Sequence, residues 1–243
     1  MRAVFVRRQW ENAARSIMSF YFKPERPYDF QAGQYADITV PHANPDNRGL
    51  TRTMTFSSNP LDELVCITTR VTAEHLSTYK QALLALQPGD TISITDAMGD
   101  MVLPLDTTIP LVFVAGGVGI ASYAGIINYL LTTHDIRQIS LHYTVRATDD
   151  IAFQNLLDRY RASGHLIAAL YTPIVNTPYA YPTELQPRRL TAAGIAVSLP
   201  LGAQVYLSGS MTMVEELRGE LQSTFNLPQY RIAFDYFDGY TQT

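Results

Sequence analysis

The stretch Phe113-Val-Ala-Gly-Gly-Val-Gly-Ile120 decides how this chain folds. An apolar run, three glycines and a further apolar segment indicate a buried strand, a tight turn and a helix. The backbone amides of such a turn and the start of the helix suit a pyrophosphate, and glycine lets the backbone approach a ligand closely. The third glycine of the dinucleotide fingerprint G-x-G-x-x-G is missing, so a turn without a ligand fits this stretch equally well.

Around this stretch, strands alternate with helices. Strands are predicted at 111–115, 139–145, 166–170 and 204–207, with helices over about 120–131, from Asp149-Asp150 onward and after Ser210. This alternation indicates a parallel sheet with right-handed crossovers. No charged residue lies between Asp106 and Asp135, a length that can span a bilayer, but Pro110 and the glycines favour strand, turn and helix. Residues 171–187 contain several prolines and are predicted to form a surface loop.

The first hundred residues have a different rhythm. Strands are predicted at 36–40, 64–70 and 91–95, separated by turn residues, and a short helix at 77–86 has Ser77 as its N-cap. Closely spaced strands with one helix indicate a small antiparallel barrel. The predicted fold is therefore an antiparallel β-barrel, residues 1–106, followed by a parallel-sheet α/β nucleotide-binding domain, residues 107–243.

Composition excludes several classes of function. The chain has 243 residues, 47% of them hydrophobic and 16% charged, with a net charge of −4, which supports a packed core and argues against a nucleic-acid partner. One cysteine, Cys66, excludes an intramolecular disulfide and a cluster held by this chain's own thiolates. The five histidines lack metal-ligand spacing, so no metal is expected. Arg7, Arg8 and Glu11 interrupt any signal-peptide pattern, so we expect a cytoplasmic protein.

Three further motifs could carry chemistry. Arg52-Thr-Met-Thr-Phe-Ser-Ser58 could hold a phosphate and a heterocycle, or be a strand with a surface arginine. Tyr206-Leu-Ser-Gly-Ser-Met211 ends a parallel strand where ligands bind in such sheets, or is a helix start capped by Ser210. Phe234-Asp-Tyr-Phe-Asp-Gly-Tyr240 could close the core or cover a ligand, and composition favours closure.

The order of these motifs resembles the ferredoxin–NADP reductase superfamily over nearly the whole chain. Gln31-Ala-Gly-Gln-Tyr35 is similar to that family's Pro-Gly-Gln-Tyr segment. Leu86-Gln-Pro-Gly-Asp90 and Met98-Gly-Asp-Met-Val-Leu-Pro104 are similar to its Pro-Gly-Asp and Gly-x-Phe-x-Leu stretches. The turn at residues 208–210 is similar to its Cys-Gly-Pro turn. No cysteine-rich ferredoxin module accompanies the reductase pattern.

The resemblance implies FAD in the barrel and NADPH or NADH on the α/β domain. It places Arg52 at the FAD pyrophosphate, Thr55 near flavin N5, Ser208 near the nicotinamide, and Phe237 or Tyr240 over the flavin. The implied catalytic residues are Ser208 and Thr55. The implied cofactor-binding residues are Arg52, Thr53, Met54, Thr55, Thr69, Leu76, Ser77, Thr78, Gly117, Val118, Gly119, Ile120, Ser208, Gly209, Met211 and Phe237.

The implied function is an FAD-dependent NAD(P)H oxidoreductase. Hydride passes from nicotinamide C4 to flavin N5, and electrons continue to a separate acceptor, either a ferredoxin- or flavodoxin-like protein, another redox partner or a small molecule. The pattern indicates no transmembrane segment and leaves peripheral membrane association open. Arg146 could pair with a coenzyme 2′-phosphate, whereas Asp149 and Asp150 would repel it; on balance we expect NADPH.

Two alternatives stay open. Met54 replaces a flavin-stacking tyrosine, Ala121-Ser122 replaces Thr-Pro, and Ser208 replaces the cysteine of Cys-Gly-Pro. These departures would suit a flavoprotein subunit that binds nucleotide without turnover or serves an electron chain. The second alternative keeps only the C-terminal half, as a nicotinamide-dependent dehydrogenase without flavin.

Overall fold

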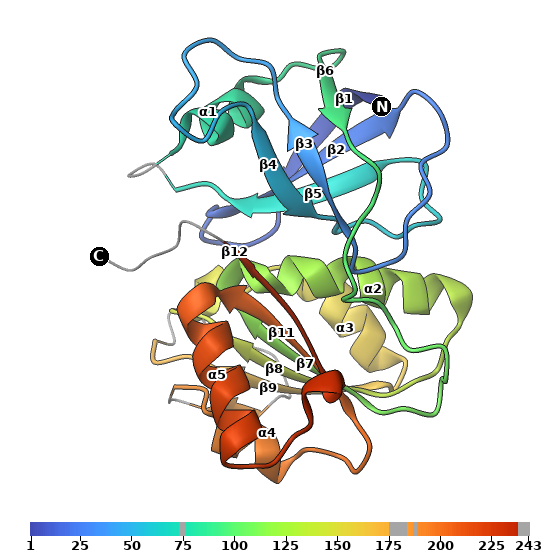
Figure 1. Cartoon of the computed structure of the whole chain (residues 1–243), viewed down its shortest axis with the longest axis vertical. Helices are drawn as coiled ribbons and strands as arrows, with labels where there is room; N and C mark the ends of the chain where they lie inside the picture. The colour runs from blue at the N-terminus through green and yellow to red at the C-terminus, as the bar shows by residue number, and fades with distance from the viewer. Residues whose placement is uncertain (73–75, 175–183, 187–188, 238–243) are drawn as a thin grey trace.

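The computed structural model of the chain contains two sheets, one above the other, each with its own helices (Figure 1). The structure describes residues 1–72, 76–174, 184–186 and 189–237. The first sheet is antiparallel and the second is parallel. This confirms the predicted fold class, an antiparallel barrel followed by an α/β domain.

Within the described residues, the N-terminal sheet has six strands in the order β4-β3-β6-β1-β2-β5. They are β1 (Arg2–Trp10), β2 (Ile17–Pro24), β3 (Tyr35–Thr39), β4 (Thr51–Thr55), β5 (Val65–Arg70) and β6 (Thr91–Ile94). The sheet closes because a bridge pairs Phe56, just after β4, with Ile67 of β5, and the Ser57 amide donates to the Cys66 carbonyl at 2.9 Å. Alternate residues face inward and form one buried apolar core.

A short helix, α1 (Thr78–Ala85), covers part of this barrel. The Ser77 side chain accepts a hydrogen bond from the Lys80 amide, so Ser77 is the N-cap that the sequence predicted. Leu83 is fully buried in the barrel core. The Tyr79 hydroxyl donates to the Ile38 carbonyl at 3.1 Å, which fixes the start of the helix against β3.

The described C-terminal sheet has six parallel strands in the order β10-β9-β8-β7-β11-β12. The strands are β7 (Leu111–Gly116), β8 (Ile139–Thr144), β9 (Leu166–Tyr171), β10 (Glu184–Gln186), β11 (Gln204–Ser210) and β12 (Ile232–Phe237). The helices are α2 (Ile120–Thr133), α3 (Gln154–Ala162), α4 (Ala192–Val197) and α5 (Met211–Ser223). Short 3-10 turns occupy Gly117–Gly119 (η2), Thr148–Asp150 (η3) and Gln229–Arg231 (η4).

The helices cover both faces of this sheet. α2 and α3 pack on one face, in a core that also takes in Ile17 and Met101 from outside the α/β region. α4 and α5 pack on the other face. The uncharged stretch therefore forms β7, the glycine turn and a 14-residue helix. In the part of the chain that the structure describes, we find no helix with the length and apolarity needed to cross a membrane.

Some local predictions were wrong. Asp149 and Asp150 form a 3-10 turn rather than opening a helix, and α3 begins only at Gln154, after Phe153 with a φ of 58°. β10 lies at the end of the segment predicted as a surface loop, and residues 175–183 and 187 of that segment lie outside the described residues. Strands β1, β2 and β12 and helix α4 had not been predicted.

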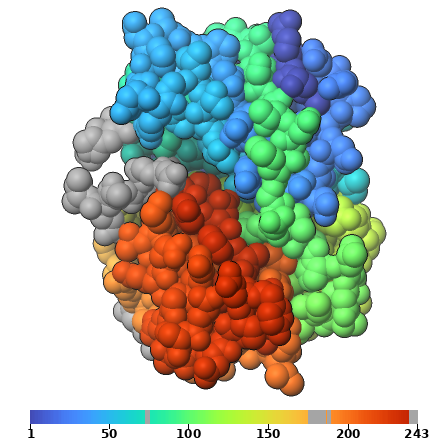
Figure 2. Space-filling view, viewed as in Figure 1, coloured from blue at the N-terminus to red at the C-terminus, as the bar shows by residue number. Residues whose placement is uncertain are grey.

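The barrel packs against the side of the α/β domain where the Thr55 hydroxyl donates to Asp235 of β12, and Figure 2 shows the two halves in contact. At the tip of the β1–β2 hairpin, the Ala14 amide donates to the Asp149 carbonyl at 2.9 Å, and the Phe153 amide donates to the Glu11 carbonyl at 3.1 Å. A Cβ at Gly125 of α2 would lie 2.7 Å from the Ser58 carbonyl oxygen, so helix and barrel backbones are in close contact. We propose the domain boundary at residues 106 and 107, in the irregular segment between β6 and β7.

Candidate functional site

The topology of the parallel sheet marks one place for a ligand. The chain runs outward from β7 to β8, β9 and β10, then returns to the other side of β7 with β11 and β12. In open α/β sheets, ligands bind at the carboxyl ends of the strands where the order reverses. Here that point lies between β7 and β11, facing the barrel (Figure 1).

Glycines make the approach between these two strands possible. A Cβ at Gly119 would lie 2.5 Å from the Ser208 carbonyl carbon and 2.9 Å from the Gly209 nitrogen, and closer still to the Ser208 carbonyl oxygen. A Cβ at Gly209 would lie 3.3 Å from Gly116 Cα. α2 begins at this point without a side-chain cap, and the Ile120 amide donates to the carbonyls of Gly117 and Val118 in the glycine turn. A helix start of this kind can bind an anion.

A polar cluster, formed by Thr55, Ser122, Ser208 and Asp235, lies where the barrel meets the α/β domain. The Thr55 hydroxyl donates to Asp235 Oδ2 at 2.5 Å, and the Ser122 hydroxyl donates to the same oxygen at 3.5 Å. The hydroxyls of Ser122 and Ser208 are 3.3 Å apart. The structure thus links Thr55 and Ser208, the two residues predicted as catalytic, through two residues that were not assigned to the site.

Burial sets the electrostatics of this cluster. It raises the pKa of Asp235, while the hydrogen bonds from Thr55, Ser122 and the Tyr236 amide lower it in part. A carboxyl group with a raised pKa can exchange a proton at a pH closer to neutrality than an exposed aspartate can.

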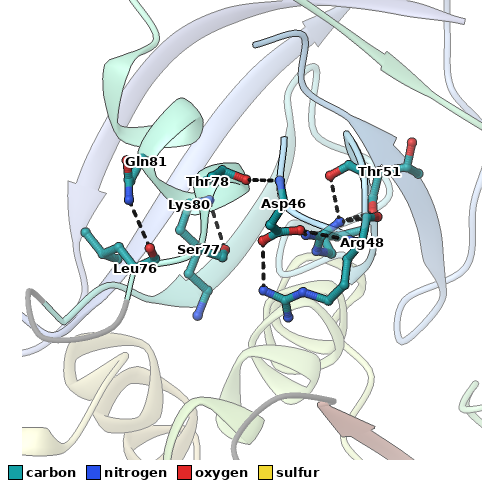
Figure 3. A network of polar contacts seen from close by, with 10 residues as sticks. Asp46, Arg48, Thr51, Leu76, Ser77, Thr78, Lys80 and Gln81 are labelled. Atoms are coloured by element: carbon teal, nitrogen blue, oxygen red, sulfur yellow. Dashed lines mark hydrogen bonds and ion pairs between the residues drawn. The ribbon is translucent and has the colours of Figure 1, made fainter. Parts of the chain in front are cut away.

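A second group of predicted residues surrounds the start of α1 (Figure 3). Arg52 Nη2 donates to Asp46 Oδ1 at 2.9 Å, and Arg48 Nη2 donates to Asp46 Oδ2 at 3.1 Å. The Asp46 amide donates to the Thr78 hydroxyl at 2.9 Å, and Ser77 caps the helix. Two guanidinium groups and a helix start, features that suit a phosphate group, therefore lie together with an aspartate.

The other predicted residues are distributed over both domains. The Thr53 hydroxyl donates to Asp37 at 2.7 Å, Met54 and Leu76 pack against the barrel core, and Thr69 is buried in β5. In the α/β domain, Val118 and Ile120 are buried, whereas Met211 and Arg146 are exposed. Phe237 packs against the core under α2. Tyr240 lies outside the described residues.

Sequence reasoning missed Arg70 as well as Asp235. Arg70 ends β5, and a Cβ at Gly117 would lie 3.0 Å from Arg70 Nη2, so the guanidinium lies against the glycine turn. The Tyr143 hydroxyl donates to the Gly117 carbonyl at 3.1 Å and steadies the same turn. A charged residue at the end of an otherwise uncharged strand was the available signal for Arg70.

Comparison with known proteins matches part of the α/β domain to a family of oxidoreductases. Residues 113–218 match the family of oxidoreductase NAD-binding domains. The reductase component of propane 2-monooxygenase from Rhodococcus jostii is 24% identical over 242 residues, which cover 93% of this chain and 61% of that protein. The chain thus spans about three-fifths of that relative's length.

Two solved structures share the fold over nearly the whole chain. The FAD/NAD-binding domain of nitric oxide dioxygenase from Vibrio cholerae has a TM-score of 0.77 and 18% identity, covering 97% of this chain and 98% of that one. Ferredoxin–NADP+ reductase from Plasmodium falciparum has a TM-score of 0.76 and 16% identity, covering 97% and 95%. Like these structures, the chain has a barrel followed by an α/β domain, and the α/β domain contains the segment that matches the NAD-binding family. The chain shares its fold with ferredoxin–NADP+ reductase, in agreement with the resemblance seen in the sequence, and residues 113–218 match an oxidoreductase NAD-binding domain.

Proposed function

We propose that the chain is an FAD-dependent NAD(P)H oxidoreductase that passes electrons to an acceptor on another molecule. The polar cluster carries this proposal, because it joins the barrel to the carboxyl ends of the parallel strands at one point. A reaction between two cofactors, one on each domain, needs such a meeting point. Bound FAD would supply the redox chemistry, as an acceptor of hydride from a nicotinamide and a donor of electrons to an acceptor.

The residues present fit both cofactors. Arg52, Ser77 and Thr78 supply a guanidinium and a helix start for the FAD pyrophosphate. The glycine turn and the uncapped start of α2 suit the pyrophosphate of the coenzyme, and Arg70 beside Gly117 adds a positive charge.

The polar cluster would supply proton control. Thr55 and Asp235 hold a proton between Oγ1 and Oδ2, and burial of Asp235 favours its neutral form. Ser208 is small enough to let a planar ring approach and is oriented by Ser122. The chemistry itself belongs to the cofactors, and the chain supplies position and electrostatics.

We propose NADPH as the preferred coenzyme. Arg146 is exposed just past the carboxyl end of β8, where a 2′-phosphate can reach it. The Ser16 hydroxyl donates to Asp150 Oδ1 at 3.4 Å, so this carboxylate is turned toward the β1–β2 hairpin. Equal rates of flavin reduction by NADH and NADPH would refute the preference.

The acceptor is proposed to be a separate redox protein or small molecule. The relative from Rhodococcus is named as one component of a monooxygenase, which supports a partner that receives electrons from a reductase. A ferredoxin- or flavodoxin-like protein, or another redox partner, would fit this role.

The visible absorption spectrum of the purified protein, before and after anaerobic NADPH, tests the proposal. We expect an oxidised-flavin band that NADPH bleaches. A band that neither NADPH nor NADH bleaches would favour the subunit that binds nucleotide without turnover. If no band appears even after incubation with FAD, the proposal fails and the flavin-free dehydrogenase becomes the better hypothesis.

A further inference from the structure

The loop between β3 and β4 places one acidic residue among the groups assigned to the FAD pyrophosphate. Asp46 Oδ1 accepts from Arg52 Nη2 at 2.9 Å, and Asp46 Oδ2 accepts from Arg48 Nη2 at 3.1 Å. The Asp46 amide also donates to the Thr78 hydroxyl at 2.9 Å, at the first residue of α1 (Figure 3). Asp46 therefore contacts both the arginine and the helix start that a pyrophosphate would contact.

Arg52 has its remaining contacts on the protein itself. Its Nη1 donates to the carbonyls of Arg48, Gly49 and Thr51 at 2.9, 3.1 and 2.7 Å. Its side chain is only 17% exposed, and the Asp46 side chain is 24% exposed. In the described part of the chain, Asp46 is thus the carboxylate that neutralises a nearly enclosed Arg52.

Asp46 is charged at neutral pH. Desolvation raises its pKa, but the hydrogen bonds from Arg48 and the charges of Arg48 and Arg52 outweigh this, so the pKa lies below its ordinary value. A guanidinium binds carboxylates and phosphates through the same planar fork. A phosphate brought to Arg52 would therefore meet a like charge already in place.

We propose that Asp46 is an internal counter-anion that occupies the Arg52 fork and weakens FAD binding until the phosphates replace it. The inference rests on the proposed function, since it concerns the same FAD site. Removal of Asp46 from Arg52 would release two guanidinium groups, Arg48 and Arg52, toward the phosphates. The segment between β3 and β4 is a loop that contains no helix or strand.

This role predicts opposite signs for two measurements. In the wild type, the Arg48 amide donates to Asp46 Oδ1 at 3.0 Å. Asp46→Asn removes the negative charge but keeps a side-chain oxygen that can accept hydrogen bonds from this amide and from Arg52. We expect the apo-protein to unfold at a lower temperature, because an ion pair is lost. We also expect FAD to bind more tightly, by roughly twofold to fivefold, the range of a partly exposed ion pair. A residue that only shapes the loop would lower both stability and affinity.

The experiment is a titration of the full-length apo-protein with FAD, followed by quenching of flavin fluorescence, alongside thermal unfolding. The matched control is Asp106→Asn, in the segment between the domains. It removes the charge of a carboxylate that accepts hydrogen bonds from the Thr108 amide and hydroxyl, and it should leave the FAD affinity unchanged. Asp46→Ser repeats the test if Asp46→Asn does not fold. Asp46→Glu keeps the charge and should keep the wild-type affinity within about twofold.

The outcomes separate the two hypotheses. Tighter binding by Asp46→Asn, and loss of that gain when Arg52→Gln is added, would support the inference. Unchanged or weaker binding by both neutral variants, while the wild type binds FAD, would overturn it and leave the proposed function intact. If the wild type and every variant bind no FAD, the proposed function fails, and the inference fails with it.

Discussion

Substitution of Gly119 tests the close contact between the glycine turn before α2 and the end of β11. Gly119 caps α2 and lies directly against the backbone of β11, between Ser208 and Gly209. In Gly119→Ala, the added Cβ would lie 2.5 Å from the Ser208 carbonyl carbon, whereas ordinary contact begins at 3.4 Å. The neighbouring atoms are backbone, so no rotamer change relieves the overlap. α2 and β11 must therefore separate by about 1 Å.

This separation has two measurable consequences. Overpacking of a well-packed site costs about 1–3 kcal/mol, and contact with backbone rather than side-chain atoms places Gly119→Ala at the upper end. The same movement lengthens the 3.3 Å contact between Ser122 on α2 and Ser208 on β11. We therefore expect a loss of about 2–3 kcal/mol in the free energy of unfolding. We also expect slower flavin reduction by NADPH.

Gly219→Ala is the matched control. Gly219 is exposed within α5 and has no atom within 4 Å of an added Cβ, so alanine should stabilise this helix by about 1 kcal/mol. Urea unfolding followed by circular dichroism measures both variants, and stopped-flow absorbance measures flavin reduction. If Gly119→Ala unfolds at the wild-type urea concentration, the close approach of α2 and β11 is wrong.

Three further predictions concern the same region. Thr55→Val removes the donor to Asp235 and should cost about 1.5–3 kcal/mol in urea unfolding, whereas Thr55→Ser should retain most of the stability; equal losses would contradict the hydrogen bond. Because folding raises the pKa of Asp235, its ionisation costs stability as the pH rises above the ordinary value of 3.8, so Asp235→Asn should gain stability relative to the wild type between pH 4 and pH 7; a constant difference would refute this. Arg70→Gln should weaken NADPH binding about tenfold while leaving FAD affinity unchanged, as measured by separate titrations, and a loss confined to FAD would place Arg70 in the other site.

The elements that the sequence predicted are those with a clean pattern. Alternation in β6, the buried run of β7 and the serine cap of α1 each have a local cause, so the surrounding fold does not alter them. β1 escaped prediction because Val4, Phe5 and Val6 are all apolar and Arg7 and Arg8 follow them, so its sequence does not alternate cleanly. Asp149 and Asp150 suggest a helix start, but the hairpin tip binds the Asp149 carbonyl from the barrel side. That contact depends on the tertiary fold and has no signal nearby in the sequence.

In the candidate site too, residues within sequence motifs were predicted, whereas residues brought in by the tertiary fold were missed. Motif order placed Thr55 and Ser208 near the reacting centre, and the structure brings both into one cluster. The resemblance had no role for Asp235, which lies 180 residues from Thr55 in the chain. Only the docking of the barrel on the carboxyl ends of the strands brings the two together. Arg70 was missed for the same reason, since its neighbour Gly117 belongs to the other domain.

Two departures from the family pattern, Ser122 and Ser208, are in contact with each other in the structure. Ser122 replaces a proline and Ser208 replaces a cysteine, and together with Met54 and Ala121 these departures motivated the alternative of a protein that binds nucleotide without turnover. In the structure, the two serine hydroxyls are 3.3 Å apart, and Ser122 also donates to Asp235. Proline has no hydroxyl to offer at position 122, so the serine there gives Ser208 a partner. The two replacements therefore form one local change that keeps a polar connection from Ser208 to Asp235, and this favours the reductase over the subunit without turnover.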